Sequence, residues 1–300
     1  MYKFKRDRVT GRETNREIMI LLESDVLGVP RRSLRMTGDE RIINGVDAPD
    51  QYLYMAAVFA DGATLCGGTF VSRSWILTAA QCVVGWVSAD AHLTFTFKLE
   101  APIQGFTIWE VWLGVTSLAG GDPGRITIVS DNATANPSYS GNNYDIAVIN
   151  TIVVEAPESE TAANGCASPS SSSLVADLAP ADLPFRSDTP ASLIGEVAVM
   201  TGWGATVAGG PTETTLKTAN GSFAGECGAG YHVCIYTYNQ VDVTTGDYGG
   251  PLTVAGVGVG SYKVVGVAIG TDLSGNRSVF TNVYQNLDWI ASVTDLPIYD

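Results

Sequence analysis

The chain has 300 residues, of which 45% are hydrophobic, 16% are charged and 33 are glycine. This composition supports a sizeable core with many turns, and the length allows one large domain or two small ones. The sequence contains no run of about 18 apolar residues, so it predicts no transmembrane helix.

The net charge of −14 is unevenly distributed along the chain. Residues 1–41 contain 10 of the 17 lysines and arginines and 7 acidic residues, which leaves 7 basic and 24 acidic residues, a net charge of −17, in the remainder. An acidic body of this kind disfavours nucleic acid, heparin and anionic membranes as partners, and it keeps the protein soluble.

Residues 1–41 are polar and basic and show no strand pattern. We interpret them as a disordered tail, as a pro-segment, or as both. Their longest apolar stretch, Ile18–Leu22, is too short for the hydrophobic region of a signal peptide. We therefore expect that the natural start differs or that the sequence is imperfect there.

From Ile42 the sequence consists of short β-branched and aromatic runs separated by Gly, Asn, Asp and Pro. The expected strands are Leu53–Phe59, Thr69–Leu77, Leu93–Leu99, Phe106–Leu113, Ile126–Val129, Ile146–Val154, Gly195–Gly202, Val233–Tyr238, Pro251–Val259 and Tyr262–Ile269. Short strands at this spacing predict an all-β barrel or sandwich. Residues 155–190, rich in Ala, Ser and Pro, are interpreted as a linker, and Val283–Val293 has a helical pattern before the tail at 294–300.

The cysteines and histidines indicate an extracellular chain without a metal site. The five cysteines are Cys66, Cys82, Cys166, Cys227 and Cys234. None has zinc-type spacing, and His92 and His232 are isolated, so we expect no metal and no cofactor. Two disulfides with one odd thiol fit a secreted protein, as do the possible glycosylation sites Asn132, Asn220 and Asn276.

Five short motifs follow one another along the chain. They are Arg41-Ile42-Ile43-Asn44-Gly45, Trp75-Ile76-Leu77-Thr78-Ala79-Ala80-Gln81-Cys82, Tyr144-Asp145-Ile146-Ala147-Val148, Thr201-Gly202-Trp203-Gly204 and Gly246-Asp247-Tyr248-Gly249-Gly250-Pro251-Leu252. In this order they resemble the chymotrypsin/trypsin family of serine proteases (peptidase S1). The resemblance implies an all-β fold of two six-stranded antiparallel Greek-key β-barrels with a C-terminal helix. It covers residues 42–293, with the first barrel at about 53–154, the linker at 155–190, the second barrel at about 195–282 and the helix at about 283–293.

The chain departs from the family at two of its three catalytic positions. Gln81 stands where the family has the histidine that acts as general base, and an amide cannot take a proton near neutral pH. Tyr248 stands where the family has the nucleophilic serine, and a phenol is a poor nucleophile without a base. Asp145 matches the third position, but the imidazole that it would orient is missing. The sequence therefore predicts a non-catalytic homologue.

The family resemblance also assigns an activation switch. Cleavage after Arg41 would expose Ile42, whose new amino group would pair with the buried carboxylate of Asp247. A surviving cleavage-driven switch and an inherited scaffold are both open interpretations. Gly246 and Tyr248 match the positions of the oxyanion loop, and the resemblance pairs Cys66 with Cys82. Cys227 and Cys234 are expected to close a shorter hairpin, and Cys166 to be a buried thiol or an intermolecular link.

The substrate pocket that the resemblance implies is altered. Asp242 matches the acid with which trypsin-like enzymes read Arg or Lys. However, Thr244 replaces a cysteine of the pocket wall, Ile269 lies in a wall segment without the usual Ser-Trp-Gly, and Ser278 replaces a glycine. We therefore expect Asp242 to be a remnant that contacts a water or a hydroxyl.

Three functions remain open from the sequence. The first is a secreted binding protein on an inactive protease scaffold, acting as an inhibitor, decoy or cascade cofactor, as do the oomycete glucanase inhibitor proteins, with a secreted hydrolase or protease as partner. The second is a serine-type endopeptidase with residual or altered activity and trypsin-like specificity. The third is a structural or storage protein.

Overall fold

A computed structural model describes ten stretches of the chain. They are residues 45–48, 52–84, 106–120, 124–151, 178–205, 210–228, 230–237, 242–258, 260–272 and 277–300. Contacts divide the chain into Met1–Gly38 and Asp39–Asp300, and all described residues belong to the second unit. Several predicted features lie outside the described residues, namely the pro-segment with Arg41, Ile42, the strand at 93–99, His92, Cys166, the linker as far as residue 177 and Asn276.

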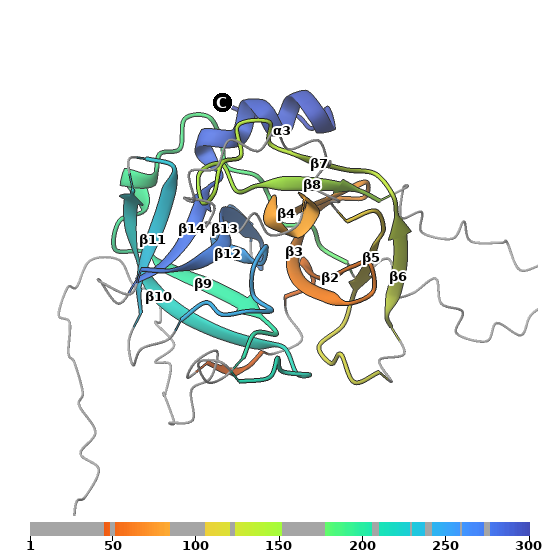
Figure 1. The fold of residues 1–300 in the computed structure, drawn as a ribbon. Helices are drawn as coiled ribbons and strands as arrows, with labels where there is room; N and C mark the ends of the chain where they lie inside the picture. The colour runs from red at the N-terminus through yellow and green to blue at the C-terminus, as the bar shows by residue number, and fades with distance from the viewer. Residues whose placement is uncertain are drawn as a thin grey trace, which may run out of the picture. The chain divides into compact units, whose positions relative to one another are not determined.

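The first half of the described chain forms one antiparallel sheet (Figure 1). Its strands are β2 (Met55–Ala60), β3 (Thr64–Ser72), β4 (Trp75–Thr78), β5 (Trp109–Leu113), β6 (Ile126–Ser130), β7 (Ala133–Ala135) and β8 (Ala147–Asn150), in the order β6-β5-β2-β3-β4-β8-β7. A turn separates β6 from β7, and there the Ser130 hydroxyl donates to the Asn150 carbonyl at 2.6 Å.

The second half forms a closed barrel. Its strands are β9 (Val197–Gly202), β10 (Lys217–Cys227), β11 (His232–Thr237), β12 (Pro251–Ala255), β13 (Tyr262–Asp272) and β14 (Arg277–Asn282), and the short β1 (Val46–Asp47) pairs with β10. Pairing of β9 with β10 closes the ring of six. The prediction of a trypsin-like all-β fold with a C-terminal helix is therefore confirmed.

Alternating apolar residues build the two cores. In β5, Trp109, Val111 and Leu113 are buried, as expected for a strand with one face on the core. The first cluster continues into the helix α3 (Leu287–Thr294), which follows the 3-10 turn η2 (Tyr284–Asn286) and buries Leu287 and Ile290. A second cluster, with Phe223 and Phe280, fills the closed barrel. Another 3-10 turn, η1 (Pro190–Leu193), precedes β9.

The cysteine pairs expected from the sequence are present as disulfides, Cys66–Cys82 and Cys227–Cys234. The first ties β3 to the short helix α1 (Gln81–Val84), which follows β4. The second links the last residue of β10 to β11.

We expect replacement of both Cys66 and Cys82 by serine to lower the free energy of unfolding by about 3 kcal/mol, because the bond closes a loop with a sequence separation of 16. The matched control is replacement of Cys227 and Cys234, whose separation of 7 gives a smaller loss, of about 2.5 kcal/mol. Urea unfolding at pH 7 measures both values. A larger loss for the second pair would contradict the loop argument.

Candidate functional site

Gln81 is held at the start of α1 by its neighbours in the chain. The disulfide fixes Cys82 to β3, and the indole Nε1 of Trp109 donates to the Cys82 carbonyl at 3.1 Å. The Gln81 side chain is consequently buried, with the residue only 7% exposed. The surrounding fold therefore fixes the position of the Gln81 side chain.

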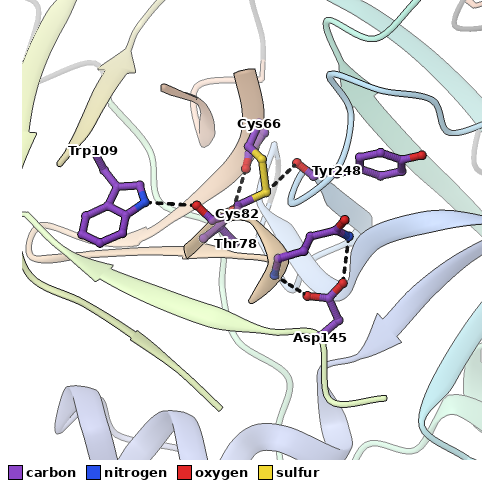
Figure 2. Close-up of a disulfide and its surroundings, with 8 residues drawn as sticks. Cys66, Thr78, Cys82, Trp109, Asp145 and Tyr248 are labelled. Atoms are coloured by element: carbon purple, nitrogen blue, oxygen red, sulfur yellow. Dashed lines mark hydrogen bonds between the residues drawn. A yellow bond between two sulfur atoms is a disulfide. The ribbon is translucent and has the colours of Figure 1, made fainter. Parts of the chain in front are cut away.

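Gln81 makes two hydrogen bonds to Asp145, which immediately precedes the segment leading into β8 (Figure 2). Its backbone N–H donates to Oδ1 and its side-chain Nε2 donates to Oδ2, both at 2.8 Å. The Asp145 carbonyl accepts a further bond, from the Thr281 hydroxyl of β14, at 2.8 Å. Asp145 therefore connects the first sheet to the second barrel while its carboxylate is turned to Gln81.

Burial raises the pKa of Asp145 to about 7, and the hydrogen bonds from the backbone of Gln81 and Ala80 and from the Gln81 side chain only partly oppose this rise. The backbone and side-chain N–H groups of Gln81 each donate a hydrogen bond to the carboxylate, but neither carries a positive charge. The Gln81 side chain thus gives Asp145 a hydrogen bond, but it is not itself a group that accepts a proton near neutral pH.

Tyr248 lies beside this pair on the loop before β12. Its carbonyl accepts the Gly67 N–H at 2.8 Å and lies 3.7 Å from Sγ of Cys82, which has no proton to donate because it is in a disulfide. The half-buried ring packs against both core clusters. Burial raises the pKa of the Tyr248 phenol, and a hydrogen bond with the Thr245 side chain partly opposes this.

Two glycines shape the Tyr248 loop, and the second of them lies against the first sheet. Gly246 and Gly249 have φ angles of +97° and +85°, in the left-handed region that favours glycine. A Cβ on Gly249 would lie 2.3 Å from the Thr78 hydroxyl and 2.5 Å from the Gly67 carbonyl oxygen. The loop at the oxyanion positions Gly246 and Tyr248 is therefore constrained by packing against β3 and β4.

Asp247 is buried, at 3% exposure, and its carboxylate is bonded to backbone groups. The N–H of Gly204 donates to Oδ1 at 2.7 Å, while Thr244 donates to Oδ2 through its N–H at 3.0 Å and its hydroxyl at 3.2 Å. Burial raises the pKa of Asp247 to about 6, and the nearby charge of Asp242 adds to the rise. A Cβ on Gly202 or Gly204 would meet this carboxylate at 2.0 Å, which explains the two glycines of the Gly202-Trp203-Gly204 motif.

The residues that the sequence assigns to an altered pocket have different surroundings in the structure, and of these Ser278 contacts Asp242. Ser278, which is fully buried on β14, donates its hydroxyl to Oδ1 of Asp242 at 3.1 Å. The Thr244 hydroxyl, which lies 3.2 Å from Oδ2 of Asp247, also lies 3.1 Å from the Ala205 carbonyl oxygen, and its single proton is donated to one of these two acceptors at a time. Ile269 is 9% exposed on β13 and lines a cleft of about 290 Å³ together with Asn142, on the loop before Asp145. Asp242 thus has a hydroxyl partner from the chain itself.

We expect Ser278→Gly to strengthen binding of benzamidine, a small aromatic cation, by about tenfold. The substitution removes a hydrogen bond to a charged group, which is worth about 1.5–3 kcal/mol, and leaves the carboxylate of Asp242 to the cation. Isothermal calorimetry measures the affinity, with Ser292→Gly, an exposed site on α3, as the matched control. Equal affinities of wild type and Ser278→Gly would contradict this role of Ser278.

Sequence reasoning missed two parts of the site. Thr281 was not recognised as a partner of Asp145, and Asn142 was not recognised as a lining residue of the cleft beside Ile269. The only sequence signal for Asn142 was its place three residues before Asp145. No group of three or more metal-ligating side chains occurs among the residues that the structure describes, and no helix there is long and apolar enough to cross a membrane.

Two antiparallel sheets bring together Gln81, at the start of α1, with Asp145 and Tyr248 on loops, and this arrangement defines a chymotrypsin-like protease scaffold. A family model described as Trypsin matches residues 42–290, and the chain belongs to the trypsin family.

Relatives and solved structures resemble nearly the whole domain. Brachyurin of Leptuca pugilator is 29% identical, over 85% of this chain and 99% of its own, and chymotrypsin of Phaedon cochleariae is 25% identical, over 79% and 75%. Among solved structures, HL collagenase has a TM-score of 0.61 and 19% identity, over 85% of this chain and 99% of its own. A mutant of human heparin binding protein (CAP37) has a TM-score of 0.60 and 23% identity, over 84% and 96%. At these identities the two structures establish the fold alone.

Proposed function

We propose that this chain is a catalytically inactive trypsin-family protein that acts by binding another protein, as an inhibitor, a decoy or a cofactor of a protease cascade. The observation that carries the proposal is the Gln81–Asp145 pair, in which both N–H groups of Gln81 donate to the carboxylate. The position of the general base is therefore filled by a group that cannot accept a proton near neutral pH.

The magnitude of the two losses supports the proposal. Removal of the serine or the histidine alone costs on the order of 10⁶ in kcat in a comparable triad, and the two losses do not add. The remnant, about 10³–10⁴ over the reaction in water, comes from the oxyanion hole and substrate binding. Here the Tyr248 ring would occupy space needed by the scissile carbonyl, and the raised pKa of its phenol keeps it protonated.

Residual endopeptidase activity is the second candidate function. Asp242 and the names of the two protease relatives favour it. It needs a new base near Tyr248, but His232, the histidine within the described residues, lines the cleft beside Ile269, and Tyr248 is not among the residues that line that cleft. Ser278 further reduces the case for trypsin-like specificity, because its hydroxyl takes up Asp242.

The proposal includes secretion and retention of the activation switch. The disulfides fit an oxidising compartment, and the acidic body opposes binding to nucleic acid, membranes and heparin, although one structural neighbour is named for heparin binding. Asp247 is buried beside backbone donors, so a new amino group at Ile42 would give its carboxylate a charged partner. N-terminal sequencing that finds the Arg41–Ile42 bond intact in the secreted protein would contradict the switch.

A covalent probe and a capture experiment test the proposed function. A fluorophosphonate probe labels an activated serine nucleophile, so we expect no labelling of the wild type at the Tyr248 position. Affinity capture from the native extracellular fluid, followed by mass spectrometry, should recover a specific protein, such as a secreted hydrolase. Labelling of the wild type that a serine-directed inhibitor prevents would overturn the proposal.

A further inference from the structure

Two exposed apolar side chains flank strand β10 on the outer surface of the closed barrel. Val197 of β9 is 62% exposed and Tyr236 of β11 is 54% exposed. Both are register partners of the same residue, Ser222 of β10. A row of three neighbouring strands therefore presents an apolar residue on each side of a small polar one, and we call Val197 and Tyr236 the β10 flank.

The middle of this row carries an N-glycosylation sequence, Asn220-Gly221-Ser222. Side chains alternate along a strand, so Asn220 and Ser222 share the outer face, and Gly221 points inward and is buried. Asn220 pairs with Val199 of β9 and lies two residues before Ser222, the partner of both flank residues. Asn220 is therefore the diagonal neighbour of Val197 and of Tyr236. Such diagonal neighbours lie about 7–8 Å apart, within reach of a larger group attached to Asn220.

Packing explains Gly221 but not its two neighbours. A Cβ on Gly221 would lie 2.8 Å from the Tyr236 carbonyl oxygen, so the close approach of β11 to β10 favours glycine there. Asn220 is exposed, and in the described part of the chain neither its side chain nor that of Ser222 makes a hydrogen bond. Among the described residues, no hydrogen bond therefore accounts for these two polar side chains.

We propose that Asn220 is N-glycosylated and that the first sugars of the glycan lie on the β10 flank. In the reaction the side-chain nitrogen of Asn220 forms a bond to the anomeric carbon of an oligosaccharide, a lipid pyrophosphate leaves, and the amide loses one proton. The donor is a lipid-linked oligosaccharide pyrophosphate of the secretory pathway. The C–H faces of the sugar rings then cover apolar surface of Val197 and Tyr236 that water would otherwise contact.

A covalently attached glycan is the occupant that the sequence itself specifies for this face. A protein partner docking on the β10 flank would have to accommodate whatever is attached to Asn220 between the two flank residues. The proposal needs passage through the secretory pathway, but it does not depend on whether the chain is catalytically inactive. Attachment of the glycan and its packing on the β10 flank can both be measured without any assay of proteolysis.

The first test is site occupancy. The full chain is directed through the secretory pathway of insect cells, and its glycans are released enzymatically in heavy-oxygen water, which marks each former glycan site as a labelled aspartate. We expect the label at Asn220 in most molecules. Asn132, which is also exposed, serves as the second site on the same molecules. An unlabelled Asn220 overturns the proposal, whatever the state of Asn132.

The second test is a double-mutant cycle for packing. Asn220→Gln removes the glycan, and we expect it to lower the thermal midpoint by about 2–4 °C, the shift that corresponds to about 1 kcal/mol in a domain of this size. In a Tyr236→Ser background the same change should lower the midpoint by less than half as much, because the glycan has lost its main contact. In a Val257→Ser background, an exposed valine on the turn after β12, the full shift should remain. An equal shift in all three backgrounds, or none in the wild type, overturns the packing.

Discussion

At pH 8 we expect Asp145→Asn to raise the free energy of unfolding by about 4 kcal/mol, because it removes a buried negative charge that has no cationic partner in the Gln81 pair. The asparagine oxygen would accept the Gln81 backbone N–H. The Gln81 side chain would turn its amide and accept a bond from the asparagine nitrogen. The two hydrogen bonds with Gln81 are thereby kept while the charge is lost.

The pH dependence gives the sign of this effect. The pKa of Asp145 rises from the ordinary 3.8 to about 7 on folding, so below about pH 4 both states hold the proton. Between about pH 4 and 7 only the folded state holds it, and wild-type stability falls as the pH rises, by up to about 1.4 kcal/mol per pH unit. The advantage of Asp145→Asn should therefore grow across this window and be small at pH 4. Asp247, with its pKa raised to about 6, leaves a smaller slope in the variant.

Urea unfolding of both proteins between pH 4 and 8 measures this difference. Asp61→Asn is the control of opposite sign, because hydrogen bonds from Thr107 and Ile108 lower the pKa of this exposed carboxyl. Asp61→Asn, which removes this carboxylate, should therefore destabilise the protein at pH 8. If Asp145→Asn also destabilises the protein at pH 8, the ionised carboxylate stabilises the folded state. That result would contradict the view that Asp145 faces only the uncharged Gln81.

The second large effect is expected for Gly204→Ala. The new Cβ would lie 2.0 Å from Oδ2 and 2.3 Å from Cγ of Asp247, a fully buried group that cannot move into solvent. Overpacking usually costs about 1–3 kcal/mol of stability. We expect the free energy of unfolding to fall by about 3 kcal/mol or more here, because the displaced carboxylate would also lose its hydrogen bond from the N–H of residue 204.

Thermal unfolding and urea unfolding measure the loss. Gly258→Ala is the matched control, since a Cβ there would make only ordinary contacts, 3.5 Å and 3.8 Å from the Ser261 side chain. The control should change the free energy of unfolding by less than about 1 kcal/mol. A Gly204→Ala variant as stable as the control would mean that the Asp247 carboxylate does not occupy the described position.

The sequence predicted the family fold because its motifs coincide with turns that the packing requires. Gly249 and Gly204 are visible in the sequence, and the structure explains them by the approach of β3 and of the Asp247 carboxylate. Strand β10 was not predicted, although it is 11 residues long, because its sequence is rich in Ala, Gly and Asn rather than β-branched residues. Its place is set by three neighbours, β9, β11 and β1, which a local pattern does not reveal.

Other differences between the predicted and the observed structure also arise from contacts that a local sequence pattern does not reveal. The single expected strand Thr69–Leu77 is two strands joined by a turn at Arg73-Ser74, because both strands of the hairpin are apolar and read as one run. The strand β14 was also missed, and with it the contact of Ser278 with Asp242. The identity of the residues at the catalytic positions could be read from the sequence, but the bidentate geometry of Gln81 and Asp145 could not, since it depends on the rotamer that burial imposes.

The most direct test of catalytic inactivity is hydrolysis of a panel of chromogenic peptides by the full chain after cleavage at Arg41. The double variant Gln81→His with Tyr248→Ser, cleaved in the same way, shows whether the scaffold can still support catalysis once the triad is restored. We predict no turnover by the cleaved wild type above the rate of the buffer. Turnover by the wild type that a serine-directed inhibitor abolishes would contradict the account.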